Sequence, residues 1–158
     1  MKKNSHGFSY IELIFTLAIL SLIISAASPV FETIKKRERE TELKINLRQI
    51  RTAIDAYKLA YDAGRILNVE NESGYPKTLN DLVLGVPNEL SPIKESIYFL
   101  RAIPPDPMYQ GNKVSPEFTW GKRSYDSSAE DPHEGRDVFD IYSTSREKGL
   151  NGTPYCFW

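Results

Sequence analysis

The sequence predicts an α+β protein in which one long N-terminal α-helix packs on a small antiparallel β-sheet. Two observations predict this class. An apolar N-terminal run is followed by a helical stripe of apolar residues, and the rest of the chain is broken by turns into short extended segments. A chain of 158 residues suits one compact domain with an appendage. We divide it into a short N-terminal leader (1–7), an apolar helical segment (8–31), an amphipathic continuation of that helix (32–63) and a C-terminal globular part (64–158).

The composition resembles that of an ordinary soluble protein and hides how unevenly the apolar residues are placed. With 20 Lys and Arg against 21 Asp and Glu, the chain has no charge excess to attract nucleic acid, so we expect no nucleic-acid partner. His6 and His133 are far apart and no Gly-rich phosphate loop is present, so we expect no enzyme and no catalytic residue. Cys156 is alone and cannot form an intrachain disulfide.

The apolar run from Phe8 to Phe31 is long enough for a transmembrane helix, but it contains one acid. An unpaired Glu12 carboxylate in lipid would cost several kcal/mol. If the bond after Gly7 is cut, Phe8 gains an α-amino group one helical turn from Glu12, and a neighbouring copy can present the same charge. Cutting the chain therefore creates the cation that Glu12 lacks.

Two other readings of this run stay open. It has the charged start and apolar middle of a secretory signal peptide, with Ser25-Ala26-Ala27 as the cleavage site, although Glu12 and the length of the run are unusual there. It also suits an uncleaved membrane anchor. Pro29 removes one helical hydrogen bond, which suits either a helix that repacks after leaving the membrane or a simple exit from the bilayer.

The residues Gly7-Phe8-Ser9-Tyr10-Ile11-Glu12-Leu13 resemble the class III leader junction of type IV pilins and of the pseudopilins of type II secretion. The resemblance implies that prepilin peptidase cuts after Gly7 and methylates the amino group of Phe8. It also implies that Glu12 meets a neighbour's N-terminus during assembly. Pro29 falls where many pilins carry a proline.

The same resemblance implies a single pass through a bacterial inner membrane, with the N-terminus cytoplasmic and the C-terminal part periplasmic. Basic residues are more numerous after the apolar run than before it, which taken alone opposes this orientation. A following domain of more than about 60 residues, however, translocates largely regardless of its charge.

Beyond the apolar run, residues 32–42 are polar on nearly every side and predict a solvated neck. The helical pattern then resumes, and Gly64 is expected to end the helix. A helix from Phe8 to Ala63, at about 1.5 Å per residue, is about 84 Å long, which is too long for residues 64–158 to cover. We therefore expect the first half of the helix to project from the globular part. We expect the apolar stripe to pack on the sheet, with a two-stranded coiled coil as the alternative. The stripe comprises Leu43, Leu47, Ile50, Ile54, Tyr57 and Tyr61.

In the C-terminal part we predict a short helix from Thr78, as its N-cap, to Gly85. A second apolar run covers residues 97–103, and residues 118–124, 138–143 and 155–158 look extended. In the middle segment, alternation places Phe139 and Ile141 toward the helix, and turns Asp140 and Tyr142 away from it.

The order of these segments is similar to that of the major pseudopilin of type II secretion and implies a pilin-like fold. The residues that carry this resemblance are Tyr75-Pro76, Ile103-Pro104-Pro105-Asp106-Pro107, Asp140-Ile141-Tyr142-Ser143 and Trp158. In that family an aspartate-rich loop after the last strand holds calcium, whereas residues 144–152 contain no aspartate. We therefore expect no cofactor, although the acidic stretch from Asp126 to Asp140 stays open as another place for an ion.

The resemblance implies a structural subunit of a type II secretion pseudopilus. Its partners would be prepilin peptidase, other copies of itself, minor pseudopilins and the inner-membrane secretion platform. A type IV pilus subunit for adhesion, motility or DNA uptake is the nearest alternative. A secreted enzyme or binding protein with a conventional signal peptide, and a monomeric membrane-anchored binding head, are further alternatives.

Overall fold

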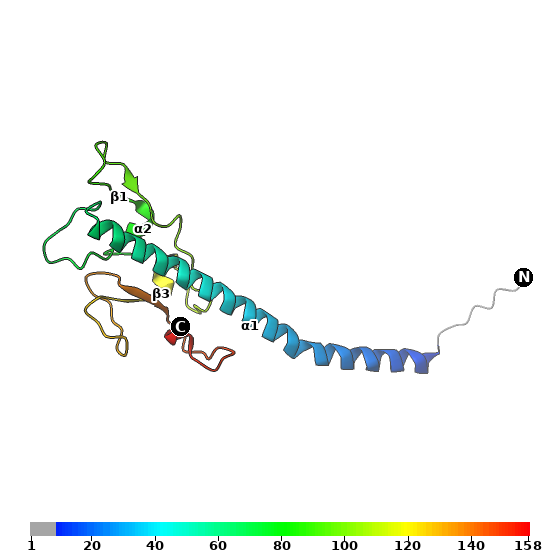
Figure 1. Cartoon of the computed structure of the whole chain (residues 1–158). Helices are drawn as coiled ribbons and strands as arrows, with labels where there is room; N and C mark the ends of the chain where they lie inside the picture. Colours follow the sequence, from blue (N-terminus) through cyan, green and yellow to red (C-terminus); the bar gives the residue numbers. More distant parts are fainter. Residues whose placement is uncertain (1–8) are drawn as a thin grey trace, which may run out of the picture. The chain divides into compact units, whose positions relative to one another are not determined.

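The computed structural model of the protein describes residues 9–158 (Figure 1). It divides inside its long helix into two compact units, one ending at Glu38 and the other running from Arg39 to Trp158. We call the second unit the head. The combination of one long helix with small antiparallel sheets confirms the α+β class.

Helix α1 runs from Tyr10 to Asp62 and contains Pro29. The prediction of one continuous helix is confirmed within the described residues, and its end at Asp62 lies one residue before the predicted Ala63, whereas Phe8 lies outside the described residues. Proline has no N–H to donate, and one turn later the Thr33 hydroxyl donates to the Pro29 carbonyl at 2.9 Å. At the other end Gly64, with φ of 69°, donates its N–H to the carbonyl of Tyr61 and stops the helix as predicted.

The predicted apolar stripe of α1 is the centre of the head's core. All six of its side chains are buried, and Leu43 and Ile50 are fully inaccessible. The same cluster contains Trp120 and Ile141 from the strands, together with Leu79, Leu82, Leu100 and Met108 from the loops and the short helix. The head's own chain therefore covers the stripe, as expected, and leaves no free seam there for a coiled coil.

Two separate two-stranded antiparallel sheets replace the single sheet that we expected. Strands β1 (Val86–Pro87) and β2 (Ser96–Ile97) form a small hairpin. Strands β3 (Trp120–Arg123) and β4 (Asp140–Ser143) pair with Trp120 opposite Ser143 and Arg123 opposite Asp140. The predicted segments 118–124 and 138–143 thus do pair, over a shorter length than expected.

The short helix α2 spans Asp81–Leu84 and ends before Gly85, as predicted. The N-cap prediction is wrong, because Asn80 occupies that position and makes no side-chain cap. The Thr78 backbone N–H instead donates to the Asp81 carboxylate at 2.9 Å. An N-cap Thr78 would accept a hydrogen bond from the first turn of the helix with its side chain. Instead, the side chain of Asp81 in the first turn accepts one from the Thr78 backbone.

Two predicted extended segments, 155–158 and 118–124, differ in the structure, and the apolar run 97–103 is mostly irregular. Residues Tyr155–Phe157 form a 3-10 helix, η2, because a turn forms in which the N–H groups of Phe157 and Trp158 donate to the carbonyls of Pro154 and Tyr155. A second 3-10 turn, η1 (Pro116–Thr119), takes up the start of segment 118–124. Of the run 97–103, only residue 97 lies in a strand.

The facing predicted for segment 138–143 is only partly correct. Ile141 is fully buried in the core, but Val138, not Phe139, is the second core residue of the segment. Phe139 packs edge-on against Tyr75, with ring centroids 5.0 Å apart. Asp140 turns toward α1. The strand begins only at Asp140, so alternation does not extend back to the residues before it.

Candidate functional site

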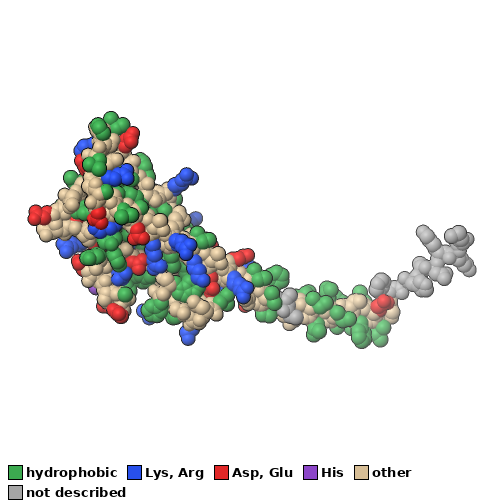
Figure 2. Space-filling model, viewed as in Figure 1, with side chains coloured by type: hydrophobic (Ala, Val, Ile, Leu, Met, Phe, Trp, Pro, Cys, Tyr) green, Lys and Arg blue, Asp and Glu red, His purple; other side chains and the backbone are tan. Residues whose placement is uncertain are grey.

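The N-terminal part of α1 exposes apolar side chains all round its surface. None of its most apolar 18-residue stretch is buried. Hydrophobic side chains cover this part of α1 in Figure 2. A helix that is apolar on every side is not stable in water by itself and needs lipid or apolar protein around it. Helix α1 is long and apolar enough to span a membrane. The large exposed side chains are Tyr10, Ile11, Leu13, Ile14, Phe15, Leu17, Ile19, Leu20, Leu22, Ile23, Ile24, Val30, Phe31 and Ile34.

Glu12 lies in the first turn of α1 among these apolar side chains and is exposed. Among the described residues, no cation lies within ion-pair distance of its carboxylate. The partial positive charge of a helix N-terminus stabilises an acid by about 0.3–1 kcal/mol, which is less than the several kcal/mol that a charged side chain costs in lipid. The helix alone therefore does not satisfy Glu12.

The predicted cleavage and methylation positions, Gly7 and Phe8, lie outside the described residues. Pro29, the fourth predicted site residue, is exposed on α1. Among residues 9–158, the structure thus places Glu12 and Pro29 on the same helix without contact between them, and the partner predicted for Glu12 is not among these residues.

In the head, the structure brings together motifs that are far apart in the sequence. The Asp106 carboxylate accepts hydrogen bonds from the Ser143 hydroxyl at 2.6 Å and from the Met108 N–H at 2.8 Å. The indole N–H of Trp120 donates to the Pro104 carbonyl at 2.8 Å. Burial raises the pKa of Asp106 above its usual value, and its hydrogen bonds oppose that shift. The Pro-Pro-Asp-Pro segment therefore fastens the chain to both β3 and β4.

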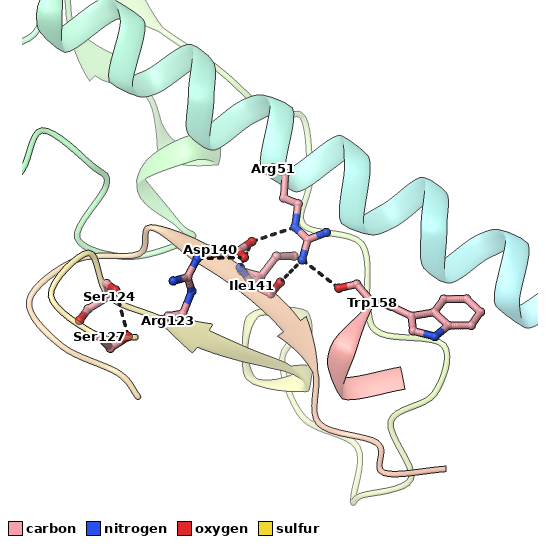
Figure 3. A network of polar contacts seen from close by, with 7 residues as sticks. All are labelled: Arg51, Arg123, Ser124, Ser127, Asp140, Ile141 and Trp158. Atoms are coloured by element: carbon pink, nitrogen blue, oxygen red, sulfur yellow. Dashed lines mark hydrogen bonds and ion pairs between the residues drawn. The ribbon is translucent and has the colours of Figure 1, made fainter. Parts of the chain in front are cut away.

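Arg51 on α1 holds three parts of the head together (Figure 3). Its Nε donates to Asp140 Oδ1 at 2.8 Å, and its Nη2 donates to the main-chain oxygens of Ile141 at 2.9 Å and Trp158 at 3.0 Å. The planar guanidinium presents several donors at fixed angles, which suits three acceptors from two segments. Arg123 on β3 also lies 3.5 Å from Asp140, so this carboxylate receives two cations.

Glu40 closes the last loop of the head onto α1. Its carboxylate is buried and accepts hydrogen bonds from the Leu150 N–H at 2.7 Å and from the Tyr155 hydroxyl at 2.9 Å. Burial, with the hydrogen bond to Glu40, raises the pKa of Tyr155 to about 12. The prediction that residues 32–42 form a solvated neck is therefore wrong at Glu40. Glu40 lies three residues before Leu43, so it continues the buried stripe by one helical step.

Sequence reasoning missed Glu40 and Arg51 as structural residues. A signal existed for Glu40, whose spacing from Leu43 places it on the buried face. No comparable signal marked Arg51, which lies beside the stripe and has partners about 90 and 107 residues away. Its role appears only when the chain is folded.

Several acids of the stretch from Asp126 to Asp140 have partners within the protein. Asp137 accepts hydrogen bonds from the Ser73 hydroxyl and from the Tyr125 N–H, the latter at 2.9 Å. Glu134 lies 3.5 Å from Lys122, and Asp140 is bound by Arg51. Within residues 9–158 no three His, Cys, Asp or Glu side chains are grouped to hold a metal ion. This stretch therefore offers no preformed ion site among the described residues.

No family model matches the chain, and neither a curated protein nor a solved structure is found to match it. The functional conclusion therefore rests on the motifs of the sequence and on the exposed apolar helix.

Proposed function

We propose that this chain is a structural pseudopilin subunit of a type II secretion system. Prepilin peptidase cuts it after Gly7 and methylates Phe8. The subunit is held first in the bacterial inner membrane, with its head in the periplasm. It then assembles with other copies and with minor pseudopilins, on the inner-membrane platform, into a periplasmic pseudopilus that drives protein export.

The exposed apolar surface of α1 is the observation that carries this proposal. None of its most apolar stretch is buried, so the described part of the chain leaves this surface without a partner. A pseudopilin uses such a surface twice, first against lipid and then against the apolar helices of neighbouring subunits. Both environments satisfy a helix that is apolar on every side.

Glu12 adds a reason for assembly between copies. In lipid its carboxylate needs a cation, and cutting after Gly7 provides one at the N-terminus of every copy. The amine of an adjacent subunit then neutralises the acid when the helices pack together. A conventional signal peptide gives no role to an acid within its apolar region.

Processing is tested by the mass of the mature N-terminus of the native protein. We expect it to start at Phe8 with one added methyl group, and we expect Gly7→Val to leave an uncut precursor. Asn4→Val, which places the same residue type elsewhere in the leader, should be cut normally. A mature protein that starts at Met1, or after Ala27, would contradict the proposal.

Assembly is tested with Glu12→Ala, crosslinked in the cells that make the protein. We expect normal cutting but a strong loss of the multimer ladder, because the neighbour's amine has no acid to meet. Glu32→Ala removes an exposed acid from α1 outside the apolar run and serves as the matched control. An unchanged ladder in Glu12→Ala would remove the role given to this residue.

A further inference from the structure

A groove of about 720 Å³ lies in the head between α1 and the C-terminal segment. Its apolar wall includes Ile45, which is 58 % exposed, and Phe157, which is 73 % exposed. Trp158 lies in the same wall and packs edge-on against Tyr155, with ring centroids 5.0 Å apart. This volume lies within the range of ligand-binding pockets and leaves room for a few side chains of a partner.

The groove has a positive rim. Its lining contains three cations, Lys44, Arg48 and Arg51, and one acid, Asp55. Arg51 is neutralised by Asp140, and Lys44 lies over the Trp158 ring at 4.7 Å. Arg48 is exposed and has no ion-pair partner among the residues that the structure describes. Lys and Arg side chains gather along α1 on the face of the head shown in Figure 2. The groove therefore favours an apolar segment that carries an acid.

The turn of the β1–β2 hairpin, residues 88–95, has this chemistry. Leu90 is 67 % exposed and Ile93 is 74 % exposed. The Glu95 side chain is exposed and has no cation beside it among the described residues, whereas Glu89 is paired with Lys94. Hydrophobic side chains lie at the tip of the head in Figure 2, where the hairpin is in Figure 1.

Hydrogen bonds within the turn preorganise the hairpin in the absence of a partner. The Ser91 N–H donates to the Asn88 carbonyl at 3.1 Å, the Lys94 N–H donates to the Ser91 carbonyl at 3.0 Å, and the Asn88 side chain accepts from the Leu90 N–H at 3.2 Å. These bonds fix the turn and hold its apolar side chains outward. A preorganised segment loses less conformational entropy when it binds.

The hairpin and the C-terminal segment lie on opposite sides of α1 in Figure 1. The hairpin contributes no residue to the lining of its own chain's groove, while each copy offers one hairpin and one groove. We infer that the β1–β2 hairpin of one copy docks in the groove of the next copy, with Leu90 and Ile93 against Ile45 and Phe157. Such a contact is heterologous, so it can extend from copy to copy, and it gives an open filament where the rotation between copies does not close a ring. The inference rests on the proposed function, because it names the head surfaces that meet during assembly.

Cysteine crosslinking in the cells that make the full chain tests this contact, in a Cys156→Ser background with a short bismaleimide crosslinker. Ile45→Cys and Ile93→Cys on separate chains should give a crosslinked dimer when both are made together, and neither should crosslink alone. Both substitutions on one chain should give a ladder. Ile45→Cys with Leu67→Cys, an exposed residue outside the hairpin, is the matched control and should not crosslink.

A charge exchange tests whether Glu95 of the hairpin pairs with Arg48 of the groove. Arg48→Glu and Glu95→Arg should each lower the crosslinked yield about twofold to fivefold, the effect of one exposed ion pair, and the two together should restore it. Three outcomes would overturn the inference: no product for the 45/93 pair, a product limited to a dimer when both substitutions are on one chain, or a product that contains another protein. If cutting after Gly7 and the Glu12-dependent ladder persist in that case, only this inference fails. An uncut chain would instead count against the proposed function.

Discussion

The Asp106 carboxylate bridges the Ser143 hydroxyl, at 2.6 Å, and the backbone N–H of Met108, at 2.8 Å. Ser143 is fully buried and Asp106 is 4 % exposed. The contact joins two segments that are 37 residues apart in the sequence. Because water cannot replace a lost partner at such a buried position, the bridge makes a measurable contribution to the stability of the head.

We first predict the effect of removing this bridge. Asp106→Ala should lower the free energy of unfolding by about 1–3 kcal/mol, because the buried Met108 N–H and Ser143 hydroxyl lose their acceptor. The unfolding of the full chain in detergent can be followed by the fluorescence of Trp120 and Trp158, both of which lie in the head. Asp131→Ala, at an exposed position, should change the free energy by less than about 0.5 kcal/mol. Equal effects of the two substitutions would contradict the role of Asp106.

The second prediction concerns pH. Burial raises the pKa of Asp106, so the folded head holds this proton more tightly than the unfolded chain does. The resulting stabilisation is fully present below the unfolded pKa, about 3.9, and is lost as the pH rises through the higher folded pKa. Asp106→Asn keeps an acceptor for Met108 and cannot titrate. The stability of the wild type relative to Asp106→Asn should therefore fall as the pH rises just above 4, and a difference that rises there would contradict the shift.

Third, we predict that the Tyr155 hydroxyl stabilises the closed loop. Tyr155→Phe should cost about 1.5–3 kcal/mol, because the buried Glu40 carboxylate then loses the hydroxyl donor and keeps the Leu150 N–H. The pKa of Tyr155 is raised to about 12, so this contribution should stay constant through neutral pH and decline only above about pH 10. Tyr98→Phe, at an exposed ring, is the matched control for denaturant unfolding. A cost no larger than that of the control would show that the bond is not stabilising.

Our fourth prediction compares two glycines that both have positive φ. A Cβ atom at Gly74, where φ is 82°, would lie 2.6 Å from Cδ1 of the Tyr61 ring. That ring cannot move freely, because its hydroxyl donates to Asn68 at 2.6 Å. At Gly64, where φ is 69°, a Cβ would meet nothing within 4 Å. Gly64→Ala should cost about 1–2 kcal/mol in denaturant unfolding, from the backbone alone, and Gly74→Ala should cost clearly more. Equal losses of unfolding free energy in the two variants would mean that the Tyr61 ring moves aside without a measurable penalty.

The parts of the fold that depend on local periodicity were predictable from the sequence. The spacing of Leu43 to Tyr61 defines one helical face, and the whole of that face is buried. Gly64 and Gly85 end helices because glycine adopts positive φ without strain. Ile141 is also buried as predicted, because its segment does form a strand, although a shorter one than predicted.

The errors lie where contacts between distant residues decide the local structure. Phe139 leaves the predicted face because the rings of Tyr75 and Tyr125 pack around it. The predicted strand at residues 155–158 instead curls into a turn, which brings the Tyr155 hydroxyl to Glu40 and the Trp158 oxygen to Arg51. Glu12 is a different case, because the sequence identified it as unusual and the partner predicted for it belongs to another molecule.

The contacts of Glu40 also bear on the order in which the head folds. Glu40 leaves the ribosome long before its donors, which lie 110 and 115 residues later in the chain. Until the final turn has been synthesised, the acid stays hydrated and the helix face beside it stays uncovered. Closing so long a loop is entropically slow, so the head reaches its native state as a late event. Ribosome-bound chains that lack only their last few residues should therefore remain sensitive to protease.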